Sequence, residues 1–311
     1  MNYGFGVDLG GTAVKIAYFD ETGTMLHKWE IPTDTKDNGK NILPDIAAAI
    51  NGYLSQNKIA KESILGIGIG VPGPVDDRGV VNKCINLGWG VFNIQKALSE
   101  LTGLRVKAGN DANMAALGES WMGGGKGCNS MVLATLGTGV GGGIIINGKP
   151  LTGAHGSAGE IGHLVVEPNE PEYCPCGKRG CVEQYCSATG IVRLANKRLS
   201  TKGDESVLRQ IENLTCKDVF DAGRDGDAVA LEILEQVYDY MGQFLANVSC
   251  SIDPEVVVLG GGVSKAGQIL LAGAQRYFHK YIFHASYSIR FALATLGNDA
   301  GTYGAFKLVL E

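Results

Sequence analysis

Residues 153–183 read GAHGSAGEIGHLVVEPNEPEYCPCGKRGCVE, and this stretch organises the rest of the chain. It places His163 a short loop upstream of Cys174, Cys176 and Cys181. One histidine with three cysteines is the ligand count of a closed tetrahedral zinc site, which has no coordination position left for water or substrate. We therefore expect these four residues to hold a structural zinc ion that acts as a clamp.

The same stretch carries two carboxylates, Glu160 before the histidine and Glu183 just after the last cysteine. A metal clamp would tie the strand end with Glu160 and His163 to the loop with Glu183. Two acidic groups and an imidazole could then converge on one pocket rich in hydrogen-bond acceptors. Such a pocket suits a sugar, whose hydroxyl groups need those acceptors.

The alternative is that these cysteines are ordinary thiols, because free cysteine behaves as a small core hydrophobe. We expect that role for Cys84, Cys128, Cys216 and Cys250, which lie alone in apolar or mixed surroundings. It suits residues 174–181 poorly, because Pro175, two glycines and two cations make that segment a tight polar turn, and nearby cations favour thiolates. Cys186 competes for the fourth ligand position, but a predicted helix follows it, so His163 is favoured.

The bulk composition limits the classes of function. The chain has 311 residues, 45% hydrophobic content and a net charge of −5, which allows two cores of ordinary size and argues against nucleic acid as a partner. No apolar stretch reaches the length of about 18 residues that a membrane span needs. The start MNYGFGVDLGGT does not follow the signal-peptide pattern, and eight cysteines without one suit a reducing compartment. We expect a cytoplasmic protein that binds neither nucleic acid nor a membrane.

The N-terminal segment predicts a phosphate-binding hairpin. Residues 5–9 read as a strand, Gly10, Gly11 and Thr12 as a turn, and residues 14–19 as a returning strand. Turns of this kind present backbone N–H groups that hold phosphate oxygens. Asp8 at the mouth could hold magnesium directly or through water. The alternative is a plain hairpin in which Asp8 is buried or caps the turn.

A second candidate lies where a strand gives way to an alanine-rich helix, at Asn110 and Asp111. Both residue types are preferred helix N-caps, which would be a purely structural role. A carboxylate at such a junction also projects into a cleft, where it could accept a proton from a hydroxyl group, as kinase aspartates do. Both roles can coexist in the pair.

Two further glycine turns follow, one around Thr138 and Gly139 and one around Gly261 and Gly262. The first contains G-x-G-x-x-G, but a strand follows it, and a dinucleotide-binding loop needs a helix there. The sequence has no G-x-x-x-x-G-K-[ST] loop and neither H-R-D nor D-F-G, which excludes P-loop enzymes and protein kinases. The glycine run at 123–127 is a plausible hinge between two halves.

Two halves that each begin with strand, glycine turn and strand, followed by a third glycine turn, match the order of nucleotide-binding loops in the actin-like, ribonuclease H-type ATPase fold. Along its whole length the sequence resembles the ROK family (repressors, open reading frames, kinases), and most closely its bacterial members that phosphorylate glucose. The resemblance rests on motifs at 8–12, 72–74, 110–113, 136–163, 174–183 and 260–262. The expected fold is a duplicated α/β fold of two domains with a cleft between them. The expected bounds are 1–120 plus 297–311 for a small domain, and 121–296 for a large domain with the zinc site.

The resemblance implies ATP-dependent phosphorylation of glucose at the 6-hydroxyl, a reaction of carbohydrate metabolism such as glycolysis. Asp111 would be the general base, and His163 would contact both zinc and sugar. The remaining sugar contacts would come from Asn110, Glu160, Glu183 and Gly73. Gly10, Gly11, Thr12, Thr138 and Gly139 would bind phosphates, Gly261 and Gly262 would pack on adenosine, and magnesium would lie near Asp8. The family usually has a polar residue where this chain has Ala13, so a side-chain contact to phosphate is not expected there. A homodimer or homotetramer is also implied.

Three rival functions share parts of this pattern. Another sugar kinase of the family, acting on N-acetylmannosamine, fructose or allose, would carry the same motifs. A sugar-responsive repressor would need a DNA-binding segment before the first hairpin, where we expect no room for one. A non-catalytic sugar- or zinc-binding module would need neither Asp111 nor three phosphate turns.

Overall fold

The computed structural model describes residues 2–311, which fall into two units. The first unit comprises Met1–Asn129, Gly143–Gly159 and Leu296–Glu311, and the second comprises Ser130–Gly142 and Glu160–Thr295. Residues 121–129 and 143–159 thus group with the first unit, whereas the sequence-based division assigned them to the large domain. One reason is close packing on the helix that follows Asn110: a Cβ added to Gly143 would lie 2.5 Å from the Ala116 Cβ. The domain bounds expected from the sequence stay a prediction.

A five-stranded sheet with the order β3-β2-β1-β4-β7 forms the centre of the first unit. β1 (Tyr3–Leu9) pairs with β2 (Ala13–Asp20) in antiparallel fashion, with Leu9 opposite Val14. This confirms the hairpin predicted around residues 10–12. The sheet is completed by β3 (Met25–Pro32), β4 (Ile64–Val71) and β7 (Val106–Asn110).

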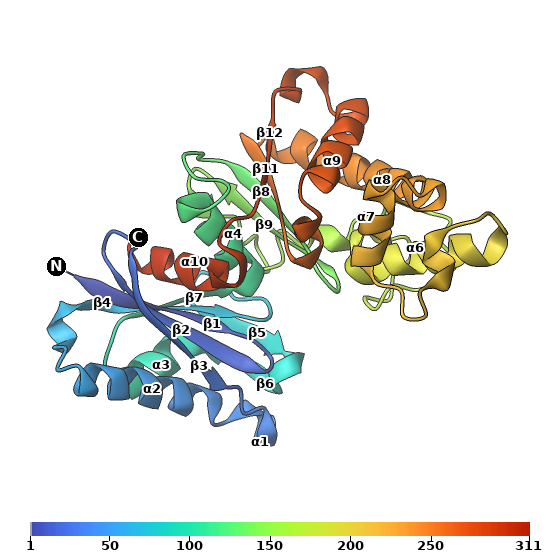
Figure 1. The fold of residues 1–311 in the computed structure, drawn as a ribbon. Helices are drawn as coiled ribbons and strands as arrows, with labels where there is room; N and C mark the ends of the chain where they lie inside the picture. Colours follow the sequence, from blue (N-terminus) through green and yellow to red (C-terminus); the bar gives the residue numbers. More distant parts are fainter. Residues whose placement is uncertain (1) are drawn as a thin grey trace. The chain divides into compact units, whose positions relative to one another are not determined.

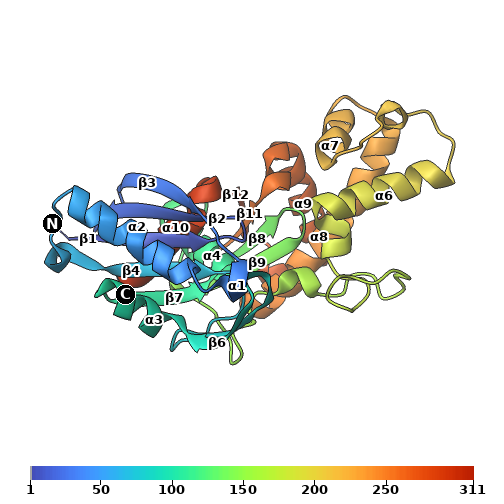
Figure 2. The same cartoon turned by 90° about the horizontal axis from the view of Figure 1, so that it is seen from below.

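Helices cover both faces of this sheet. On one face α2 (Ile42–Gln56) and α3 (Ile94–Thr102) bury their apolar sides in the main core of the unit (Figures 1 and 2). On the other face lies α10 (Ala300–Val309), which packs on α4 (Asp111–Met122) (Figure 1). Glycines in the strands let α10 approach the sheet backbone, because a Cβ added to Gly68 would lie 1.7 Å from the Ala305 carbonyl oxygen.

The second sheet has the order β10-β9-β8-β11-β12. Its central strand β11 (Val256–Gly260) runs parallel to β8 (Met131–Leu136) and to β12 (Arg290–Leu293), and it is buried along its whole length. Burial on both faces accounts for its unbroken apolar sequence. The second glycine turn connects β8 to β9 (Val140–Ile146), and β10 (Lys149–Pro150) follows.

The longest helix of the second unit is α8 (Ala228–Ile252), where the apolar residues of 227–249 recur at the i, i+3, i+4 spacing that predicts an amphipathic helix. The Asp227 side chain caps it by accepting a hydrogen bond from the Ala230 N–H. α8 and α9 (Gln268–Tyr281) lie side by side (Figure 1). The contact needs a glycine in α8, because a Cβ added to Gly242 would lie 2.4 Å from the Tyr277 carbonyl carbon.

The remaining elements are short or peripheral. They are α1 (Lys36–Gly39), β5 (Val80–Cys84), β6 (Trp89–Asn93), α5 (Glu183–Cys186), α6 (Ala188–Thr201) and α7 (Cys216–Arg224). Short 3-10 helices span Lys61–Ser63, Ile85–Leu87, Ile161–His163, Val207–Gln210, Gly262–Ala266, His284–Ser286 and Gly297–Asp299.

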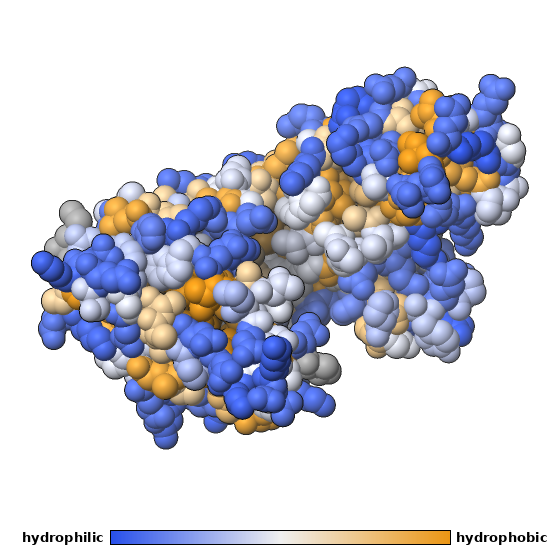
Figure 3. Space-filling model, turned by 60° about the horizontal axis from the view of Figure 1, so that its bottom comes forward, coloured by the Kyte–Doolittle hydropathy of each residue, from blue (hydrophilic) through white to orange (hydrophobic). Residues whose placement is uncertain are grey.

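The surface seen in Figure 3 is mainly hydrophilic, with hydrophobic residues interspersed in small groups. Within residues 2–311, none of the helices combines the length and the apolar character needed to cross a bilayer.

Candidate active site and metal cluster

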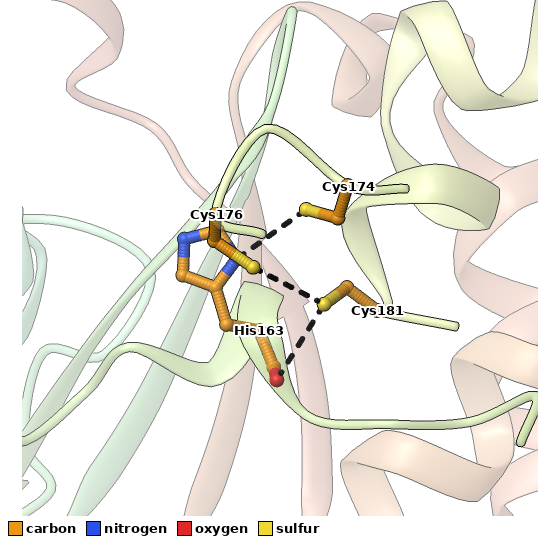
Figure 4. A group of neighbouring side chains, drawn as sticks. All are labelled: His163, Cys174, Cys176 and Cys181. Carbon is orange, nitrogen blue, oxygen red and sulfur yellow. Dashed lines mark hydrogen bonds between the residues drawn. The ribbon is translucent and has the colours of Figure 1, made fainter. Parts of the chain in front are cut away.

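The structure brings together the four residues predicted as metal ligands. One ligand atom from each of His163, Cys174, Cys176 and Cys181 lies within 4.8 Å of the others (Figure 4). His163 ends the short helix Ile161–His163, and the cysteines lie on a tight loop. In that loop the Cys174 N–H donates to the Lys178 carbonyl, and the Gly177 N–H donates to the Cys174 carbonyl.

The donor set fits zinc. A tetrahedral site with Zn–S bonds of about 2.3 Å separates two sulfurs by about 3.8 Å. The Cys176 and Cys181 sulfurs are 3.6 Å apart, and the His163 Nδ1 lies 3.9 Å from the Cys174 sulfur. Cys186, the competing ligand, points elsewhere, with its sulfur 4.0 Å from the Val237 carbonyl oxygen.

Burial disfavours charge on all three thiols, and at two of them the pKa is raised overall. It raises the pKa of Cys181 to about 12, with help from the neighbouring thiols, and it also raises the pKa of Cys174. At the exposed Cys176 burial acts in the same direction, but hydrogen bonds, first of all from the Lys178 backbone N–H, lower the pKa overall. A bound dication would have to displace protons here, so metal affinity would depend on pH.

Two predicted sugar-binding carboxylates flank the cluster. Glu183 is the first residue of α5, two positions after Cys181, and its Oε1 lies 3.9 Å from the Cys174 sulfur. Its Oε2 accepts a hydrogen bond of 3.0 Å from the Val140 N–H. Glu160 is exposed at the start of the Ile161–His163 helix, where its carbonyl accepts from the His163 N–H. The His163 ring and the Glu183 carboxylate thus both lie beside the Cys174 sulfur, each at 3.9 Å, and Glu160 precedes His163 by three residues.

Asn110 and Asp111 lie at the junction of β7 and α4, and the structure separates their roles. Asn110 is the N-cap, because its Oδ1 accepts from the Asn113 N–H at 3.1 Å. Its Nδ2 donates to the Gly73 carbonyl, also at 3.1 Å, which fixes the amide from both ends. Asp111 is the first helical residue and is half-buried, with Oδ1 accepting from the Ala112 N–H. The structural cap is thus Asn110, and the Asp111 carboxylate is not required for it.

At the first glycine turn the Gly10 N–H donates to the Ala13 carbonyl, and Gly11 and Thr12 are exposed. The Asp8 carboxylate lies beside Gly301 at the start of α10, and its Oδ2 is 3.3 Å from the Lys15 ammonium. Sequence reasoning missed Lys15. The hairpin register could have revealed it, because Asp8 and Lys15 are cross-strand partners.

The second glycine turn is held by hydrogen bonds from the first residues of α6. The Thr138 carbonyl accepts from the Thr189 hydroxyl at 2.7 Å, and the Gly137 carbonyl accepts from the Ala188 N–H. A Cβ added to Gly139 would lie 2.2 Å from Glu183 Oε2, so this turn and that carboxylate are in direct contact. Thr189 is a further residue that spacing alone did not single out.

The third glycine turn borders a cavity of about 460 Å³ in the second unit. Gly261 has φ +81°, and a Cβ there would lie 2.5 Å from the Leu136 carbonyl oxygen, so only glycine fits. Gly262 lines the cavity together with Phe220, Lys217 and Arg224. The three residues on α7 were not predicted, because nothing in the local sequence marks them as part of a site.

The two units, each a layered α/β structure whose sheet leads into glycine turns, have the architecture of the actin-like ATPases. The sequence model of the ROK family matches residues 4–311, so the chain belongs to the ROK family. It is 44% identical to a glucokinase of Halalkalibacterium halodurans, over 98% of this chain and 94% of that protein. It is 37% identical to a glucokinase of Thermotoga maritima, over 98% and 96%. The solved structure of a ROK family glucokinase from Streptomyces griseus, in complex with glucose and AMPPNP, matches with a TM-score of 0.76 and 32% identity, over 99% of each chain.

Proposed function

We propose that this protein phosphorylates glucose at the 6-hydroxyl, with ATP as the phosphoryl donor. The observation that carries the proposal is the 44% identity to a glucokinase over nearly the whole of both chains. The similarity to a ROK glucokinase solved with glucose and an ATP analogue supports the choice of both substrates.

In this proposal Asp111 is the general base that takes the proton from the sugar 6-hydroxyl. Its position as the first residue of α4 supports the role, because the helix is capped by the Asn110 side chain and does not need the Asp111 carboxylate as its cap. Asn110, Glu160, His163, Glu183 and Gly73 hold the other hydroxyls. Since the His163 Nδ1 faces the cysteine sulfurs, Nε2 is the ring nitrogen left for the sugar.

The glycine turns supply the nucleotide site. Gly10, Gly11 and Thr12 are phosphate-binding residues in this proposal, as are Thr138 and Gly139, and Gly261 and Gly262 pack on adenosine. Asp8 would hold magnesium, directly or through water, and the ion would neutralise charge on the phosphates. One carboxylate fits the usual magnesium site, which is completed by waters and phosphate oxygens.

Zinc has a structural role in the proposal. A site with four protein ligands leaves no position for catalysis, so the ion would only hold the Cys174–Cys181 loop and thereby Glu183 and His163. The homodimer or homotetramer and the cytoplasmic location expected from the sequence remain predictions. Light scattering during gel filtration would determine the oligomeric state.

The test is the initial rate with Mg-ATP on a panel of glucose, N-acetylmannosamine, fructose and mannose. We expect glucose to lead by about 10²-fold or more in kcat/KM, which is about 2.7 kcal/mol of transition-state discrimination. A higher kcat/KM with another hexose would replace glucose by that sugar and leave the kinase reaction in place. Tight sugar binding without turnover would favour a regulator instead.

A further inference from the structure

The turn Pro72-Gly73-Pro74 is attached to the first unit through three successive carbonyl groups. The Pro74 carbonyl accepts from the Asn82 N–H at 2.9 Å, and the Gly73 carbonyl accepts from the Asn110 side chain at 3.1 Å. The Pro72 carbonyl accepts from the Cys84 thiol. Because proline has no N–H, the turn is attached mainly by the hydrogen bonds that these three carbonyl groups accept.

Two of the three donors come from β5, the strand that ends at Cys84. Cys84 is 2% exposed, and the residue before it, Lys83, has φ +73°, which is uncommon for a side-chain-bearing residue. A Cβ added to Gly73 would lie 3.7 Å from the Cys84 Cβ, so the strand end lies directly beside the turn.

The thiol is suited to act as a lasting hydrogen-bond donor. Burial raises the pKa of Cys84, and the negative charge of Asp111 raises it further. The group therefore stays protonated at neutral pH.

We propose that Cys84 is a positioning residue for sugar binding. Its thiol holds the Pro72 carbonyl, which fixes the turn, and the Gly73 carbonyl then fixes the Asn110 amide. The amide in turn keeps its oxygen on the Asn113 N–H, so that α4 begins at Asp111. The inference rests on the proposed function, since Asn110 and Asp111 are taken there as sugar-binding and catalytic.

The test compares Cys84→Ala, which loses the donor, with Cys84→Ser, which keeps one, and with Cys128→Ala as a matched loss of a buried thiol in the same unit. We expect Cys84→Ala to raise the KM for sugar by about three- to tenfold, the effect of one hydrogen bond of ordinary net strength. The KM for ATP should stay within about twofold of wild type, and Cys84→Ser should recover most of the loss. Equilibrium binding of the sugar without ATP should weaken in parallel.

A double-mutant cycle separates positioning from a general effect on folding. In an Asn110→Ala background, Cys84→Ala should raise the KM for sugar by less than about twofold further, because the amide it positions is gone. Full additivity would overturn the inference, as would a Cys84→Ala enzyme with wild-type KM, or equal increases in both KM values. If Cys84→Ala does not fold, Cys84→Val, which fills the space without a donor, is judged by the same criteria.

The sugar in these assays is whichever hexose the wild-type enzyme turns over fastest. A failure of glucose in the panel would therefore overturn the proposed substrate without affecting this comparison. An unchanged Cys84→Ala variant would overturn the positioning role and leave the proposed reaction intact.

Discussion

The carboxylate of Glu183 accepts a hydrogen bond of 3.0 Å from the backbone N–H of Val140. Glu183 follows the last cysteine of the metal cluster, and Val140 follows the second glycine turn. One side chain therefore joins the loop proposed to hold zinc to the turn proposed to hold phosphate. A change in the conformation of either loop should therefore displace the Glu183 carboxylate.

This contact predicts an unusual effect of Gly139→Ala. The new methyl group would lie 2.2 Å from the Glu183 carboxylate oxygen, and the end of that side chain would move away from it. We expect the KM for glucose to rise by about threefold or more, with little change in melting temperature, because the displaced group is flexible. Gly137→Ala is the matched control, since a Cβ there meets no atom within 4 Å. An increase in the KM for ATP alone would contradict the prediction.

Asp111→Asn tests the general base. We expect kcat to fall by about 10²-fold or more, because the amide cannot take up the hydroxyl proton. The replacement keeps the size of the side chain, so the melting temperature should hardly change. Asp45→Asn, in the exposed first turn of α2, is the control for a helix-start carboxylate and should leave kcat unchanged. If kcat of Asp111→Asn stayed within about tenfold of wild type, Asp111 would not be the general base.

The metal cluster predicts about one zinc ion per chain, measured by atomic emission on protein purified without chelators. Cys181→Ser should lose the ion and lower the melting temperature by roughly 5 °C or more, because the loop at 174–181 would lose its main restraint. Cys216→Ser, outside the cluster, should keep both the zinc and the melting temperature. A metal-free protein with the wild-type melting temperature would contradict the structural role of zinc in the loop at 174–181.

Glu170 predicts a pH-dependent contribution to stability. Burial opposes its ionisation, but hydrogen bonds from Arg193 and Tyr185 outweigh burial and lower its pKa to about 2. The folded-state pKa lies below the unfolded one, so the contribution is complete above pH 4.5 and is lost as the pH falls toward 2. We expect Glu170→Gln to lower the free energy of unfolding by about 2 kcal/mol at pH 7, measured in urea.

That difference between Glu170→Gln and wild type should shrink steadily below pH 4.5. Glu172→Gln is the control, because this carboxylate contacts the same Arg193 but its side chain is 65% exposed. It should change the free energy of unfolding by less than about 0.5 kcal/mol. A difference for Glu170→Gln that stays constant down to pH 3 would show that the charge is not responsible.

Two glycines of the first unit should respond oppositely to alanine. Gly68→Ala would place a methyl group 1.7 Å from the Ala305 carbonyl, and rigid backbone cannot yield as a side chain does. We expect a loss of about 3 kcal/mol or more in the free energy of unfolding. Gly52→Ala, within α2 with open space around it, should stabilise by about 0.5–1 kcal/mol. If a urea titration gave the same change in the free energy of unfolding for both substitutions, α10 would not be packed on this strand.

Elements with strong local patterns were predicted well. The β1–β2 hairpin follows from apolar runs around a glycine turn, and α8 follows from its apolar spacing, so neither depends on distant residues. The apolar spacing also predicts a short helix at 208–214 and a helix at 92–102. Both predictions were partly wrong, because only the 3-10 helix Val207–Gln210 forms at the first and residues 92–93 lie in β6 at the second. β3 was missed because its apolar alternation is short: Trp29 and Ile31 pack on the core while Lys28 and Glu30 are exposed, and pairing with β2 completes the strand.

The four residues of the His/Cys cluster and the glycine turns could be predicted from local sequence, because tight spacing and missing Cβ atoms are local properties of the chain. The tertiary structure decided which partners these groups meet: Lys15 for Asp8, Val140 for Glu183, and Cys84 for the turn at 72–74. Each of these contacts joins separate segments that meet only because sheet register and helix packing bring them together. The free energy of those arrangements belongs to the whole core, and no local window of sequence contains it.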